Sequence, residues 1–146
     1  MILPITLTIA AAAALLNIWI ARRVGQVRIA HKISVGDAGN EVLIARMRAH
    51  SNFVEYTPFV LILLALIEMA RGSEPWLWGV GIIYILARIA HAFGMERTRP
   101  DPLRLRMIGV VVTLFVLLGL ALYAIWIAAM DRPRGPTITY AATSAL

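Results

Sequence analysis

The 146-residue sequence contains no cysteine, which excludes disulfide bonds, thiolate metal sites and cysteine nucleophiles. Charged residues are also scarce, because they make up 15% of the chain whereas a soluble domain has about 25%. Apolar residues make up 60%, against about 45–50% in a soluble domain. One domain of this length with such an apolar excess is typical of a protein whose solvent is lipid.

Several common site motifs are missing as well. The three histidines, His31, His50 and His91, lack the spacing of a zinc or iron motif, so no metal site is predicted. There is no glycine-rich phosphate loop and no serine–histidine–acid arrangement. The net charge is +6, but the basic residues gather in short links between apolar segments, as membrane topology predicts. We therefore expect no nucleic-acid partner.

Four apolar stretches are long enough to cross a bilayer, which takes about 20 residues for roughly 30 Å of hydrocarbon. Backbone groups in lipid must be satisfied within each segment, so these stretches are expected to be helices. The prediction is an all-α membrane protein, a single domain over residues 1–146 that forms a four-transmembrane-helix bundle. The expected helices cover about residues 2–21, 41–70, 76–97 and 103–130.

The basic residues also predict an orientation. The link between the second and third helices holds Arg71 as its one basic residue, and a tight turn is predicted directly after it at residues 72–75. By the positive-inside rule the other two links face the cytoplasm and both termini face out. We expect an integral protein of the bacterial inner membrane. The basic residues of the two cytoplasmic links are Arg22, Arg23, Arg28, Lys32, Arg46 and Arg48, and then Arg97, Arg99, Arg104 and Arg106.

A few polar residues lie inside the predicted spans. Arg48, Asn52 and Glu55 follow steps of four and three, so they share one face of the second helix. Arg88 and His91 are spaced in the same way on the third helix. A charge at the centre of a bilayer costs about 2.5–3.5 kcal/mol on insertion scales, so these side chains are expected to face protein or water.

Two interpretations of these charges remain open. In the first, Glu55 and Arg88 form a structural ion pair, and the other arginines extend to the membrane surface. In the second, the surplus of arginine over one carboxylate binds an anionic ligand or an anionic lipid headgroup. His91 has the same two alternatives, since a lone histidine on an apolar helix is either a hydrogen-bonded core residue or part of a site.

A twelve-residue stretch at the start of the second span carries a family resemblance. It reads Arg48-Ala49-His50-Ser51-Asn52-Phe53-Val54-Glu55-Tyr56-Thr57-Pro58-Phe59. This resembles the signature R-A-H-x-N-x-x-E, followed shortly by P-F, of the MAPEG family, the membrane-associated proteins of eicosanoid and glutathione metabolism. Its Glu-Tyr pair is similar to the leukotriene C synthase branch. Residues 25–28 and 87–91 are more similar to microsomal prostaglandin E synthase, and the resemblance covers essentially the whole chain.

The resemblance implies a homotrimer of four-helix subunits that binds glutathione between neighbouring subunits, near the cytosolic face. Arg104 matches the arginine beside the glutathione sulfur, so it is the expected catalytic residue. A guanidinium there favours the thiolate of a thiol whose pKa is otherwise about 8.5. The residues expected to line the glutathione site are Arg28, Arg48, Asn52, Glu55, Tyr56, Arg88 and His91.

Three departures from the prostaglandin synthase pattern argue against prostaglandin isomerase activity. Met95 replaces a tyrosine, Leu105 replaces a serine and Ser51 replaces an arginine. The leading hypothesis is a membrane glutathione transferase, with possible peroxidase activity, whose lipophilic second substrate arrives from the bilayer. The alternative is a glutathione- or lipid-binding protein without catalysis. A third hypothesis, a small ion-conducting protein, uses Glu55 and His91.

Overall fold

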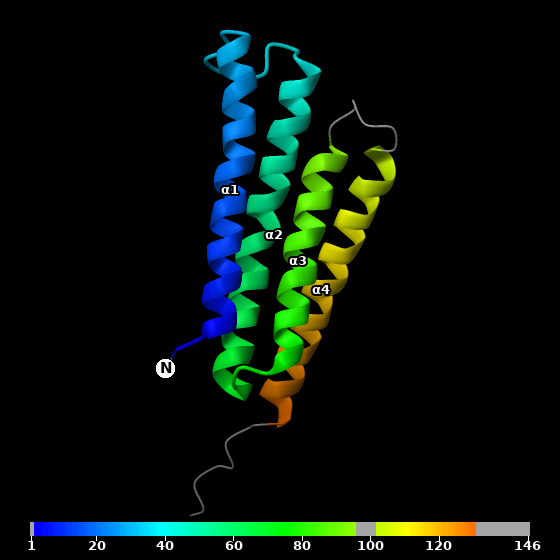
Figure 1. Ribbon diagram of the computed structural model, residues 1–146. Coiled ribbons are helices and arrows are strands. Elements are labelled where there is room, and N and C mark those ends of the chain that lie inside the picture. The colour runs from blue at the N-terminus through cyan, green and yellow to red at the C-terminus, as the bar shows by residue number, and fades with distance from the viewer. Residues whose placement is uncertain (1, 96–101, 131–146) are drawn as a thin grey trace, which may run out of the picture.

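The computed structural model describes residues 2–95 and 102–130, and in these ranges it contains helices and no strand. All four helices are long and apolar enough to cross a membrane. They run up and down beside one another (Figure 1). The predicted all-α membrane fold is confirmed. The helices are α1 (Pro4–Ala30), α2 (Glu41–Arg71), α3 (Pro75–Gly94) and α4 (Pro102–Met130).

Residues at the helix ends explain where these helices begin and stop. Proline occupies the first position of both α1 and α3, where its missing N–H removes no hydrogen bond. The Asn40 side chain caps α2 by accepting a hydrogen bond from the Leu43 backbone N–H at 2.9 Å. Gly72 then ends α2 with a φ of 84°, a conformation that suits glycine. This turn was predicted at residues 72–75.

The first helix is longer than the predicted span. It continues past Ala21 to Ala30, because arginine is a good helix former and leaving the hydrocarbon does not by itself end a helix. The Arg23 guanidinium lies 4.5 Å from the Trp19 ring and 5.4 Å from the Phe93 ring, so it packs on aromatic faces. The third helix ends at Gly94, and the predicted helical residues 96–97 lie outside the described residues.

The helices form a bundle in which α2 and α3 occupy the centre. Each of these two contacts the other three helices, whereas α1 and α4 do not contact each other within the described residues. The α3–α4 pairing is the most extensive. We call one end of the bundle the basic end: there α1 ends, α2 begins, α3 ends and α4 begins (Figure 1).

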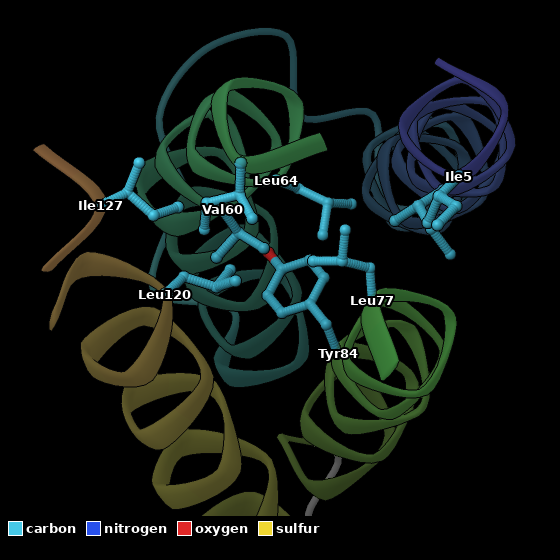
Figure 2. Close-up of a cluster of buried hydrophobic side chains, with 9 residues drawn as sticks. Ile5, Val60, Leu64, Leu77, Tyr84, Leu120 and Ile127 are labelled. Atoms are coloured by element: carbon cyan, nitrogen blue, oxygen red, sulfur yellow. The ribbon is translucent and has the colours of Figure 1, made fainter. Parts of the chain in front are cut away.

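Most of the core lies in the half of the bundle away from the basic end. Figure 2 shows side chains from all four helices pointing toward one another around Tyr84. The outer surfaces of the helices expose large apolar side chains such as Leu7, Ile62 and Phe115, which suits contact with lipid. The core cluster is Ile5, Ile9, Val60, Leu64, Ile67, Leu77, Tyr84, Leu120 and Ile127.

A buried carboxylate joins α2 to the beginning of α1. Glu68, which is 1% exposed, accepts hydrogen bonds from the backbone N–H groups of Ile5, at 3.0 Å, and Thr6, at 2.8 Å. Ser73 donates its hydroxyl to the same carboxylate at 2.7 Å. The first N–H groups of a helix have no partner within the helix and carry partial positive charge. Glu68 therefore caps α1 from another helix.

Two glycines allow α3 and α4 to approach closely near the basic end. A Cβ atom on Gly109 would lie 2.6 Å from the Cβ of His91 and 2.7 Å from the carbonyl oxygen of Ala87. A Cβ atom on Gly94 would collide with the backbone nitrogen of Arg106. Since neither glycine can be enlarged without moving backbone, this crossing fixes His91 and Arg106 relative to each other.

Candidate functional site

A polar cavity of about 480 Å³ lies between α2, α3 and α4, toward the basic end. Its volume is within the range of small-molecule sites, about 300–1,000 Å³. It contains two guanidinium groups, one carboxylate, one imidazole and two small polar groups. The lining residues are Arg48, Ser51, Asn52, Glu55, His91, Met95, Arg106 and Val110.

Arg88 does not line this cavity but contacts a residue that does. Its side chain is 1% exposed and donates hydrogen bonds to Asn52 Oδ1, at 2.8 Å, and to Thr113 Oγ1, at 3.3 Å. The structural ion pair between Glu55 and Arg88, one of the two interpretations that the sequence leaves open, is not present among the described residues, where Asn52 accepts from the Arg88 guanidinium instead. Arg88 thereby orients Asn52, which lines the cavity.

His91 is the buried polar group of the cavity. Its side chain is 4% exposed, and neither ring nitrogen has a partner that meets hydrogen-bond geometry within the described residues, although the Arg106 backbone lies beside the ring. A buried polar atom without a partner costs about 1–3 kcal/mol, so such groups are rare in folded proteins. A ligand with polar atoms would satisfy this imidazole.

Glu55 lies near the midpoint of α2, and its side chain is exposed in the single chain. Within a bilayer an exposed carboxylate that faced hydrocarbon would be unfavourable. The carboxylate therefore requires a polar ligand, water or a neighbouring protein surface beside it.

The other predicted site residues lie outside the cavity lining of one subunit. Arg28 lies in the last turn of α1 and is half-buried. Its Nη2 donates to the sulfur of Met47, on α2, at 3.5 Å. Tyr56 is half-buried one position beyond Glu55. Arg104 is exposed in the first turns of α4. One chain thus brings Arg48, Asn52, Glu55 and His91 together, with Arg88 behind them.

Arg106 lines the cavity although the sequence motifs did not single it out. From the sequence, Arg106 is only one of the basic residues in the cytoplasmic link between the third and fourth predicted helices. Two of the three departures, Ser51 and Met95, also line the cavity, so they alter its surface directly. The third, Leu105, is half-buried outside the lining.

A second hollow, of about 600 Å³, lies between α3 and α4 farther from the basic end. Its surface is almost entirely apolar, so it suits hydrocarbon and offers no charge for a peptide-like ligand. The residues that line it are Trp76, Val80, Ile83, Val112, Phe115, Val116, Gly119, Leu120 and Tyr123.

The polar cavity has the chemistry of a site for a small zwitterion. Guanidinium groups bind carboxylates by paired, charge-assisted hydrogen bonds, and a carboxylate binds an ammonium group. Glutathione carries two carboxylates, one ammonium and a thiol, so the groups present fit it. Within the described residues no three histidine, aspartate or glutamate side chains gather as metal ligands would.

Comparisons with known proteins agree with the fold. A model of the MAPEG family matches residues 6–126. The inner membrane protein YecN of Escherichia coli strain K12 is 30% identical over 102 residues, which cover 69% of this chain and 75% of that protein. The protein of the same name from Escherichia coli O6:H1 strain CFT073 matches equally well. This integral membrane protein therefore belongs to the MAPEG family.

Proposed function

We propose that this protein is a membrane glutathione transferase that acts as a homotrimer. The observation that carries the proposal is the polar cavity, where the buried imidazole of His91 lies among Arg48, Arg106 and Glu55. This set offers donors for two carboxylates and an acceptor for one ammonium. Membership of the MAPEG family supports the same ligand, since the family includes glutathione transferases.

The homotrimer is supported by what a single subunit leaves exposed. Glu55, near the middle of α2, and Arg104, on α4, both have exposed side chains. A neighbouring copy beside α2 would remove Glu55 from lipid and place further cations near it. A site between subunits also gives Arg28 and Arg104 a way to act on glutathione although neither lines the cavity of its own chain.

The proposed reaction joins the glutathione sulfur to a lipophilic electrophile from the bilayer. The thiol gives its proton to solvent, the thiolate forms a sulfur–carbon bond, and a leaving group such as halide departs with the electrons of its bond to carbon. Because the thiolate is the nucleophile, a guanidinium beside the sulfur accelerates the step. Holding both reactants in place supplies the rest of the rate enhancement.

The assignment of Arg104 as this guanidinium makes the first prediction. Arg104→Ala is expected to lower the rate of conjugation of a model aryl halide about a hundredfold or more, the loss typical of removing one stabilising donor. Glutathione affinity and oligomer size are expected to change little. The rate is measured with purified protein in detergent, and Arg22→Ala, which removes an exposed arginine of α1, is the control. Conjugation by Arg104→Ala at the wild-type rate would show that another group activates the sulfur.

The second candidate function is a glutathione- or lipid-binding protein without catalysis. Ser51, Met95 and Leu105 favour it, because each replaces a polar side chain of the prostaglandin synthase pattern. Ultraviolet absorbance separates the two functions. A transferase develops a thiolate band when glutathione binds, whereas a simple binder holds glutathione as the thiol.

The location proposed for this activity is the inner membrane of a bacterium, with the site on the cytoplasmic side. The YecN relative is an inner membrane protein by name. The basic residues of the sequence cluster at the end of the bundle that holds the cavity, which favours that end for the cytoplasm.

A further inference from the structure

We propose that Arg106 binds the glycine carboxylate of glutathione and sets the preference of the site for a free carboxylate there. This inference rests on the proposed function and names one recognition contact within it. Arg106 and Arg48 are the two arginines among the described lining residues of the polar cavity. No family motif quoted for this chain includes Arg106.

The position of Arg106 follows from the close crossing of α3 and α4. Gly94, the last residue of α3, has no side chain to push the Arg106 backbone away, and a Cβ there would collide with it. One turn further along α4, Val110 lines the same cavity. The helix face that carries Arg106 is therefore turned toward the cavity by backbone packing, and not by the flexible side chain alone.

Helix geometry separates Arg106 from Arg104. An α-helix turns about 100° per residue, so side chains two residues apart are separated by about 200° around the helix axis. The two side chains consequently point to nearly opposite sides of α4. The structure agrees, since Arg106 lines the cavity and Arg104 lies exposed outside its lining. Within one subunit, only Arg106 of these two arginines lines the cavity.

The order of groups along α2 orients the ligand. Arg48 is nearest the basic end and Glu55 is deepest, seven residues or about 10 Å farther along the helix. A tripeptide such as glutathione extends over about the same length. If Glu55 accepts the ammonium of the γ-glutamyl residue, the glycine carboxylate lies at the shallow end. Arg106 is located there, opposite the end of α3.

Calorimetry with two ligands tests this contact. Glutathione and its monoethyl ester at glycine differ by one negative charge, and both are titrated into the purified full-length protein in detergent. Wild type is expected to bind glutathione roughly ten- to a hundredfold more tightly than the ester, the range of a charge-assisted hydrogen bond. Arg106→Gln is expected to bind both ligands with nearly equal affinity. Arg22→Gln, at an exposed position of α1, is expected to keep the wild-type preference.

The outcomes separate the inference from the proposed function. If wild type saturates with glutathione and Arg106→Gln keeps the full preference over the ester, the assignment of Arg106 is overturned while the site stands. If wild type saturates with neither ligand, the proposed function fails and the contact fails with it. Because the Arg106 side chain is exposed, Arg106→Gln is expected to keep the wild-type melting temperature. That result excludes misfolding of the variant.

Discussion

Gly109→Ala is expected to destabilise the protein by about 1–3 kcal/mol and to weaken glutathione binding at least tenfold. The added Cβ would lie 2.6 Å from the His91 Cβ and 2.7 Å from the Ala87 carbonyl oxygen. Because these atoms belong to the backbone and Cβ positions of α3, which cannot rotate away, α3 and α4 must move apart. That movement displaces His91 and Arg106, which line the cavity from these two helices. Thermal unfolding in detergent and a glutathione titration measure the two effects.

Gly119→Ala is the matched control on the same helix. Nothing lies within 4 Å of a Cβ at Gly119, so this methyl group meets no neighbour. Its melting temperature and glutathione affinity are expected to stay at wild-type values. Equal behaviour of the two alanine variants would mean that the α3–α4 crossing does not shape the cavity.

Glu68→Ala is expected to destabilise the protein by about 2–4 kcal/mol, because three donors lose their acceptor at once. The backbone N–H groups of Ile5 and Thr6 and the hydroxyl of Ser73 all donate to this carboxylate. The lost negative charge also leaves the positive end of the α1 dipole uncompensated. The melting temperature in detergent is the measurement.

Glu74→Ala removes an exposed carboxylate from the same turn and serves as the comparison. Its melting temperature is expected to change by no more than a surface substitution would, within about 0.5 kcal/mol. Glu68→Gln keeps one acceptor oxygen and is expected to fall between the two variants. Indistinguishable melting temperatures for Glu68→Ala and Glu74→Ala would rule out the capping role.

The membrane-spanning helices were predictable because hydropathy reports directly on whether a segment is stable in lipid. The ends of the helices were harder to predict. Hydropathy marks where a segment leaves the hydrocarbon, whereas a helix ends where its backbone hydrogen bonding stops, and these two positions differ. The first helix runs to Ala30, well past the arginines that mark the edge of its apolar run. Local chemistry did predict the turn after α2, where glycine and proline leave few alternatives.

The partner of Arg88 could not be predicted in the same way. Sequence spacing placed Asn52 and Glu55 on one face of α2, but it did not fix the relative depth and rotation of α2 and α3. In the structure Arg88 reaches Asn52, and Thr113 of α4 provides a second acceptor. A threonine on a third helix gives no charge signal in the sequence.

Glu68 and Arg106 also carry signals in the sequence. Glu68 lies in the last turn of α2, where a negative charge opposes the helix dipole, and such a charge indicates a partner outside the helix. Arg106 follows Arg104 by two residues, a spacing that places the pair on opposite faces of a helix. Which face turns toward the cavity depends on Gly94 and Gly109, and their close contacts appear only in three dimensions.

Equilibrium binding of glutathione to the purified protein tests the central claim most directly. Calorimetry in detergent is expected to give saturable binding that weakens as salt is added, because guanidinium–carboxylate pairs carry the affinity. Cysteamine, a thiol with an ammonium but no carboxylate, is expected not to compete. Arg48→Glu, which reverses one charge of the cavity, is expected to abolish binding. No saturation with glutathione by the wild-type protein, or unchanged affinity in Arg48→Glu, would contradict the account.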